Sequence, residues 1–191
     1  MRYEKGHKEA TRRRILGVAA AEFREKGING VGVADLMKDA GLTHGGFYSH
    51  FSSKEDLVRQ VIEEAFSESR LKYPCAGEGP KNIEGLIRRY LRPEHRDHPE
   101  LGCLATTLTG ELARQPEAVR AEFTAKVGEM LAVIESHLPA KKSPAALRKT
   151  AMGIFSTMAG AMQLARAIND PKQSDALLEA GIEAACALAK N

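Results

Sequence analysis

An all-α fold is predicted by three properties of the sequence. Residues that favour helices dominate, since 28 alanines and 18 leucines stand against 8 valines, 9 isoleucines and 8 threonines. Apolar residues recur at helical spacing along the 191 residues, and no segment shows the alternation typical of a strand. Hydrophobic residues make up 43% and charged residues 28%, so the chain can build a core. The length suits one compact domain, or a small module joined to a larger one.

The first two helices are expected at residues 8–26 and 33–40. Apolar residues such as Ile15 occupy one face of the first helix, and Arg24 lies on the opposite, charged face. Gly27 is expected to end this helix, because glycine adopts the left-handed conformation of a helix C-terminus without steric cost. The buried stripe of the second helix is expected to consist of Val33, Leu36 and Met37.

The residues Gly41-Leu42-Thr43 predict a tight corner between two short helices. Gly41 would end the second helix, Leu42 would fill the corner, and Thr43 is a good N-cap for a third helix over residues 43–51. This third helix is short and polar, which is unusual for a core helix. Its inward-facing residues are expected to be Phe47 and Phe51.

Longer helical segments follow the third helix. Ser52 and Ser53 are expected to cap a fourth helix over residues 54–72, and the Pro-rich and Gly-rich residues 73–80 are the expected hinge between a front module and the rest. The last segments are rich in glycine and alanine, which favours close helix packing, although helix propensity alone would also select alanine. These further helices are expected at residues 81–91, 101–114, 117–137, 144–168 and 174–190.

The formal net charge of +3 is confined to the first third of the chain. Residues 1–60 carry 11 Lys and Arg against 8 Asp and Glu, whereas residues 61–191 carry 17 of each. A basic bias at one end suits a module that binds a polyanion, attached to a neutral body.

Several classes of protein are not expected. The longest uncharged stretch, residues 150–165, is too short for a membrane span, and the charged N-terminus leads into no signal-like apolar core. Three scattered cysteines form no disulfide scaffold, so we expect a cytoplasmic protein. We expect no enzyme and no cofactor, because the common nucleophile, phosphate-loop and zinc-protease motifs are absent. We also expect no metal site, since no standard zinc spacing is found among His95, Asp97, His98 and Cys103.

Four motifs lie at fixed mutual spacing within residues 11–57. They are T-R-x-x-I-L, A-A-x-x-F-x-x-x-G, A-G-L-T and G-G-F-Y-x-H-F-x-S-K-E-x-L. In this combination the segment resembles the DNA-binding domain of the TetR family of bacterial transcriptional regulators. The resemblance implies a helix-turn-helix DNA-binding domain over residues 1–53. A helical ligand-binding and dimerisation domain over residues 54–191 would follow, and the helix over residues 54–72 would connect the two.

The resemblance also implies how such a protein works. A ligand-responsive regulator, usually a repressor, binds a pseudo-palindromic operator as a homodimer and is released by a small-molecule inducer. The dimer would form mainly through the last two helices, and the third helix would lie in the DNA major groove.

By motif position, the third helix would supply two kinds of DNA contact. Two adjacent glycines cost up to about 1 kcal/mol each in a helix, but they let the backbone approach the DNA closely. The base-facing positions are His44, Gly45, Gly46 and Ser49. The phosphate-holding positions are Tyr48, His50 and Lys54, with Thr43 as a further donor. A solvated charged face is the preferred interpretation of Arg12, Arg13 and Arg14, which could also add electrostatic contacts.

One residue departs from the pattern of the family. Gly32 stands where the family usually has Ser or Thr, which caps the second helix and contacts a phosphate. Glycine still caps a helix, but it offers no side-chain donor. We therefore expect one phosphate contact per subunit to be missing or to be made by the backbone. Met37 also stands where a small residue is common.

A ligand pocket in the second domain is implied, and its residues are the least constrained by the sequence. The candidates mix apolar bulk with a few polar groups, as a small-molecule site does, and each one also suits a plain core position. They are Tyr90, Cys103, Thr106, Thr107, Met130, Phe155, Met158, Met162 and Gln163.

Two alternative functions remain open at this point. Cys103 follows Gly102 near a helix start, where the helix dipole stabilises negative charge, so it could act as a redox or electrophile sensor. The other alternative is an interaction protein that keeps the fold and has lost DNA binding, which only Gly32 favours.

Overall fold

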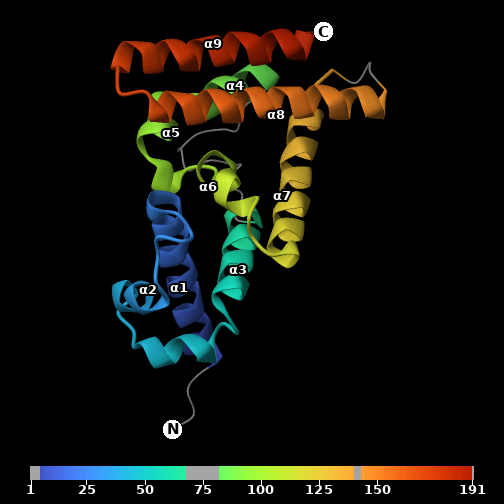
Figure 1. The fold of residues 1–191 in the computed structure, drawn as a ribbon. Coiled ribbons are helices and arrows are strands. Elements are labelled where there is room, and N and C mark those ends of the chain that lie inside the picture. Colours follow the sequence, from blue (N-terminus) through green and yellow to red (C-terminus); the bar gives the residue numbers. More distant parts are fainter. Residues whose placement is uncertain (1–4, 68–81, 140–142, 191) are drawn as a thin grey trace.

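The computed structural model describes residues 5–67, 82–139 and 143–190, and in these ranges every regular element is a helix. Figure 1 shows two parts stacked end to end. One part contains α1 (Lys5–Lys26), α2 (Val33–Asp39) and η1 (His44–Ser49), and α3 (Lys54–Ser67) leads from it into the other. At the opposite end, α8 (Pro144–Ala167) and α9 (Pro171–Lys190) lie side by side across the molecule. The predicted all-α fold is confirmed.

The corner between α2 and η1 has the predicted form. Gly41 has a φ of 68°, a left-handed conformation that glycine adopts without strain. Its N–H donates to the Lys38 carbonyl at 2.8 Å, and the N–H of Leu42 donates to the Met37 carbonyl at 2.8 Å. These two bonds satisfy the last carbonyls of α2 in a Schellman motif. Gly27, with a φ of 79°, ends α1 where the sequence predicted.

The third helix is a 3₁₀-helix and is shorter than predicted. It spans His44–Ser49, and its bonds link residues three apart, such as Gly46 N–H to the Thr43 carbonyl at 3.0 Å. Gly45 and Gly46 explain the difference, because glycine is a weak α-helix former. Thr43 occupies the N-cap position, but its hydroxyl makes no capping hydrogen bond. The prediction that the Thr43 side chain caps this helix is therefore wrong.

The serines before α3 cap it as expected. The Ser53 hydroxyl accepts the N–H of Asp56 at 3.1 Å, and the Asp56 carboxylate accepts the N–H of Ser52 at 3.0 Å. The predicted end of this helix, residues 68–72, and the predicted hinge, residues 73–80, lie outside the described residues, as does Cys75.

The second part contains more elements than the sequence predicted. The helix predicted at residues 101–114 is replaced by a 3₁₀ turn and a shorter helix, and a one-turn helix precedes them. Pro171 begins α9 three residues earlier than predicted, because the Asp170 side chain accepts the N–H of Gln173 at 3.0 Å and proline fits a first helical position. The remaining elements are α4 (Ile83–Tyr90), α5 (Pro93–Asp97), η3 (Pro99–Leu101), α6 (Leu104–Leu112) and α7 (Glu117–Ser136).

Small residues allow α8 and α9 to pack closely. A Cβ built on Gly181 of α9 would lie 2.5 Å from the Cβ of Ala161 of α8, so only glycine fits there. This contact confirms that small residues in these helices serve close packing as well as helix propensity. None of the helices in the described ranges is long and apolar enough to cross a membrane.

Candidate nucleic-acid interface

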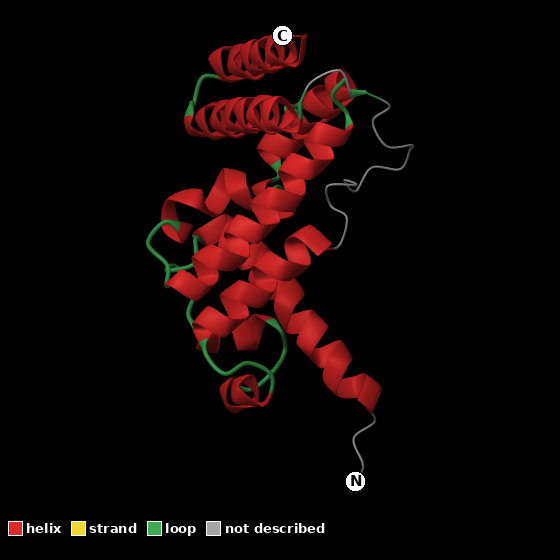
Figure 2. Ribbon diagram, turned by 90° about the vertical axis from the view of Figure 1, so that its right-hand side faces the viewer, coloured by secondary structure: helices red, strands yellow, loops and turns green. Residues whose placement is uncertain are grey.

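The helix η1 lies at the end of the molecule that is opposite to α8 and α9 (Figures 1 and 2). Two buried rings attach it to the rest of the front unit, which is the part formed by α1, α2 and η1. Phe47 is 1% exposed and Phe51 is 2% exposed, and their ring centroids are 5.5 Å apart. Because these rings anchor one side of the helix, its other side faces solvent.

The predicted base-facing residues lie on the solvent side of η1. His44, Gly45 and Ser49 are exposed, and Gly46 is half-buried. A Cβ at Gly46 would lie 3.6 Å from the Cε atom of Met37, so the buried Met37 side chain packs against the inner side of η1. The structure therefore brings these four residues together on one short element.

Two of the predicted phosphate contacts are also available to a partner. The Tyr48 ring is 66% exposed and stands edge-on to Phe47, with centroids 5.3 Å apart. Thr43 is exposed at the start of the same helix, and its hydroxyl is not used for capping. A phenol and a hydroxyl at the two ends of η1 are suited to donate to phosphate oxygens.

The other two predicted phosphate contacts are partly engaged within the chain. The Lys54 ammonium donates to the Val31 carbonyl at 2.7 Å. His50 is half-buried, and no described residue forms a hydrogen bond with its buried Nδ1 atom. Burial lowers the pKa of His50, and the positive charges of Lys8 and Arg12 lower it further. A phosphate near this histidine would therefore meet a concentration of positive charge.

The basic residues of α1 fall into two kinds. Arg12 is held in place, since it donates to Gln60 and its guanidinium carbon lies 5.8 Å from the centroid of the Phe51 ring. Arg13 is a solvated side chain, 73% exposed, and pairs with Glu9 of the same helix at 3.4 Å. The charged-face interpretation fits Arg13, whereas Arg12 helps to fix the end of η1.

Gly32 caps α2 with its backbone alone. It occupies the N-cap position in an extended conformation and makes no side-chain capping bond, and its carbonyl accepts the N–H of Leu36 at 3.0 Å. The phosphate contact that the family pattern places here has no side chain to make it.

Most of the predicted pocket residues belong to the hydrophobic core. None of them lines a cavity that is described below. Tyr90 and Phe155 pack edge to face, with centroids 6.5 Å apart, and the Gln163 amide lies at the surface and donates to the Ala105 carbonyl. Two cavities, of about 350 and 320 Å³, are lined by other residues. The proposed pocket stays a prediction. Those of its candidates that are buried are Tyr90, Thr106, Met130, Phe155, Met158 and Met162, whereas Cys103 and Thr107 are half-buried.

Cys103 does occupy a helix start, as the sequence indicated. It is the N-cap residue of α6, and its N–H donates to Nε2 of His95 at 3.1 Å. Nδ1 of His95 in turn donates to the Tyr90 carbonyl at 2.7 Å. Burial lowers the pKa of His95 to about 4, so the ring is neutral and joins two backbone groups. The described residues contain no group of three or more potential metal ligands.

Sequence reasoning missed a contact between the two parts of the molecule. Arg24, expected on the charged face of the first helix, is only 6% exposed. Its Nε donates to the Gly102 carbonyl at 2.9 Å, and its Nη1 donates to the Ala20 carbonyl at 2.7 Å. The placement on a solvated face was wrong, because the partner lies 78 residues away in the chain. The sequence around Arg24 contains no pattern that indicates its burial.

Comparisons with known proteins now place the chain in a family. Residues 15–61 match the model of the bacterial regulatory proteins of the tetR family. The HTH-type transcriptional repressor SCO4008 of Streptomyces coelicolor is 30% identical over 141 residues, which cover 69% of this chain and 71% of that protein. The chain belongs to the TetR family. It is a transcriptional regulator with a DNA-binding helix-turn-helix.

Other TetR-family proteins match either the front unit or the whole fold. The HTH-type transcriptional regulator YfiR of Bacillus subtilis, itself uncharacterised, is 32% identical over 87 residues, which cover 46% of this chain and 42% of that protein. A TetR regulator structure from Chloroflexus aurantiacus superposes with a TM-score of 0.73 at 23% identity, and it covers 97% of this chain and 95% of that chain. The shared TetR fold therefore extends over both parts of the molecule.

Proposed function

We propose that this regulator binds a pseudo-palindromic operator as a homodimer and represses transcription until a small-molecule inducer releases it. The observation that carries the proposal is the exposure of η1 at one end of the molecule, on a base of two buried phenylalanine rings. A short, polar, solvent-facing helix that follows a helix-turn-helix corner is suited to enter the major groove. Its relative in Streptomyces coelicolor is named as a repressor, which supports the repressor mode.

Within this proposal, the residues of η1 divide into readers of bases and holders of phosphates. The His44 ring can donate to or accept from a base edge, and Gly45 lets the backbone come close. Tyr48 and Thr43 hold phosphates, and Lys54 does so if it exchanges the Val31 carbonyl for a phosphate oxygen. A phosphate oxygen carries negative charge and the Val31 carbonyl does not, which favours that exchange.

The outer faces of α8 and α9 support a dimer. Large apolar side chains are exposed there, with Met152 at 49%, Leu164 at 56% and Leu188 at 37%. Large apolar side chains that remain exposed on both helices are what an interface at this end would cover. The small exposed residues of α9 would let a second copy approach closely, and they are Ala176, Ala180, Ala184 and Ala187. A two-fold axis at this end would present two copies of η1 at the other.

In vitro selection from random duplex DNA tests the proposal. We expect enrichment of a two-fold-symmetric site, with an affinity that falls steeply as salt concentration rises, because phosphate contacts release counterions. Tyr48→Ala should weaken binding to all DNA sequences about equally, whereas His44→Ala should change which sequence is preferred. If a folded dimer stripped of bound small molecules enriches no sequence, the chain is instead a fold-retaining protein that has lost DNA binding.

A further inference from the structure

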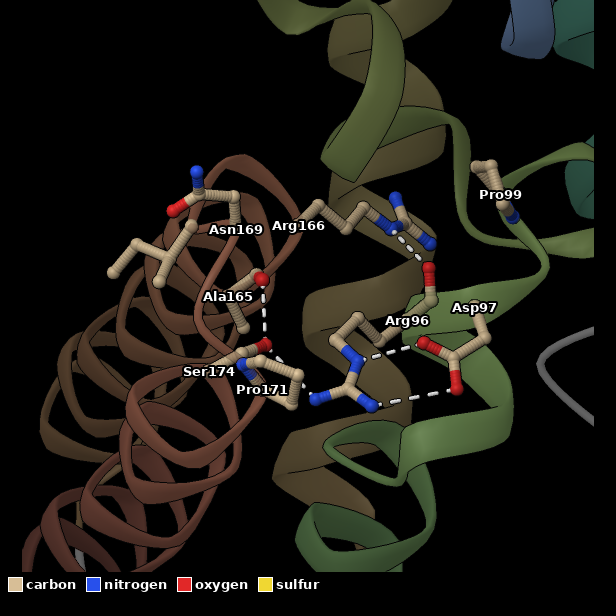
Figure 3. Close-up of a pocket in the computed structure, with 9 residues that line it drawn as sticks. Arg96, Asp97, Pro99, Ala165, Arg166, Asn169, Pro171 and Ser174 are labelled. Atoms are coloured by element: carbon tan, nitrogen blue, oxygen red, sulfur yellow. Dashed lines mark hydrogen bonds and ion pairs between the residues drawn. The ribbon is translucent and has the colours of Figure 1, made fainter.

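A cavity of about 350 Å³, open to solvent, lies beside the turn between α8 and α9. Its volume falls within the range of small-molecule sites. None of its residues belongs to the pocket that the sequence predicted. Figure 3 shows its walls, which come from α5, η3, the end of α8 and the start of α9.

Arg166 of α8 lines this cavity, is half-buried and has no acidic partner among the described residues. Its Nε donates to the Arg96 carbonyl at 3.1 Å, its Nη2 to the His95 carbonyl at 2.5 Å and its Nη1 to the Thr106 hydroxyl at 2.8 Å. All these acceptors are uncharged. Burial lowers the pKa of Arg166 and outweighs the nearby Tyr90, Cys103 and Glu100, which raise it. A partly buried cation without a counter-ion is energetically costly.

The second guanidinium of the cavity is already neutralised. Arg96 donates from Nε to the Asp97 carboxylate at 2.7 Å and from Nη1 to the Asp175 carboxylate at 2.6 Å. These contacts give Arg96 two acidic partners. Arg166 is thus the arginine of this wall that forms no ion pair with a described residue. Much of the remaining wall is apolar, and it consists of Pro99, Ala165, Ile168 and Pro171.

We propose that this cavity binds a small organic carboxylate with a compact apolar body, whose carboxylate group pairs with Arg166. A carboxylate adds ionic attraction to the hydrogen bonds of a guanidinium and accepts two parallel N–H bonds from it, which a neutral carbonyl cannot do. The apolar wall residues would cover the body of the ligand. Asp97, which also lines the cavity, would disfavour a ligand with a second negative charge, so the site selects a monoanion.

Ligand binding at Arg166 would reach the front unit through residues 95–106, a consequence that rests on the proposed function. A carboxylate competes with the His95 and Arg96 carbonyls for the guanidinium of Arg166. These carbonyls precede Gly102, whose own carbonyl accepts the Nε bond of Arg24 on α1. A ligand that withdraws Arg166 from residues 95 and 96 therefore loosens the segment on which α1 is fixed. The ligand would shift the orientation of η1 because it binds the two arrangements unequally.

Calorimetric titration with benzoate tests the site, and benzamide serves as the neutral isostere. We expect the full-length wild-type protein to bind benzoate at least about tenfold more tightly than benzamide, a difference of about 1.4 kcal/mol. Arg166→Gln should remove this preference. Asn169→Trp should fill part of the cavity with a larger side chain and keep Arg166, so the test stays decisive if Arg166→Gln does not fold. Arg120→Gln, at an exposed position on α7, is the matched control and should bind benzoate normally.

The opposite results would overturn the site. They are equal affinity of the wild type for benzoate and benzamide, no benzoate binding up to about 10 mM, or benzoate binding that survives in both cavity variants. If the site binds benzoate and the selected operator is not released by it, the regulatory consequence is wrong. If no operator can be selected at all, the proposed function fails, and the titration still decides the site.

Discussion

At the scale of single residues, the side chains that the family pattern assigns to DNA are not equally available. Tyr48 is exposed and Thr43 keeps its hydroxyl out of the capping bond, whereas Lys54 already donates to the Val31 carbonyl. The motif predicted which residues belong to the interface. It could not predict their present partners, because Val31 lies on a turn 23 residues earlier, and the bond depends on how that turn packs against α3.

Asp56 at the start of α3 should make stability depend on pH. Partial burial disfavours its charged form, but hydrogen bonds from Ser52, Gln60 and Arg59 outweigh burial and lower the pKa to about 2, from the ordinary 3.8. The unfolded chain has the ordinary value. This stabilisation is therefore fully present above about pH 4 and is lost as the pH falls toward 2.

We expect Asp56→Asn to lower the free energy of unfolding by about 1–2 kcal/mol at pH 7 and by much less near pH 2. Urea unfolding at both pH values measures the difference. Asp39→Asn, at an exposed position on α2, is the control and should change stability little at either pH. A cost for Asp56→Asn that is the same at both pH values would contradict the pKa argument.

At the scale of elements, the sequence predicted most helices well and missed only the shortest ones among the described residues. Helical periodicity and the caps at Gly27, Gly41 and Ser53 placed α1, α2 and α3 correctly within the described residues. The helix α5 has five residues and η3 has three, which is too few for any periodic pattern to show. The 3₁₀ form of η1 was also missed, because the motif specifies a helix without specifying its hydrogen-bond register.

Gly45→Ala separates the structural role of η1 from its role in DNA binding. A Cβ at Gly45 would meet no atom within 4 Å, so alanine fits the free protein. We expect the free energy of unfolding to rise by about 0.5–1 kcal/mol, because alanine loses less backbone entropy than glycine on folding. Operator affinity should fall, since the methyl group blocks the close approach of the backbone to the DNA.

The control for this prediction is Gly110→Ala on α6, where a Cβ would also meet no atom within 4 Å. It should stabilise the protein to a similar degree and leave operator affinity unchanged. Urea unfolding and an operator titration on the three proteins provide both readouts. If Gly45→Ala binds the operator as well as wild type does, Gly45 does not face the DNA.

At the scale of the whole molecule, two contacts fix the front unit to the second part. Near one end of α6, the Gly102 carbonyl accepts a hydrogen bond from Arg24 of α1. Near its other end, the Glu111 carboxylate accepts the N–H of Asn29 at 3.0 Å and packs against Gly27. Both contacts join residues about 80 positions apart, so no local sequence pattern predicted them. Together they hold α1 at two points along a single short segment.

Glu111→Ala should loosen this attachment and broaden the choice of operator spacing. In a dimer, the orientation of each front unit sets the distance between the two copies of η1, and therefore the preferred spacing of the half-sites. We expect Glu111→Ala to recognise the same half-site sequence as wild type while discriminating less between spacings that differ by one or two base pairs. Glu111→Gln retains an oxygen that can accept the Asn29 N–H, so it should keep the wild-type spacing. Selection from a library in which fixed half-sites are separated by variable spacers measures this preference. Unchanged spacing discrimination in Glu111→Ala would show that the orientation of the front unit is fixed by its other contacts, with Arg24 and the buried packing of α1 as the remaining determinants.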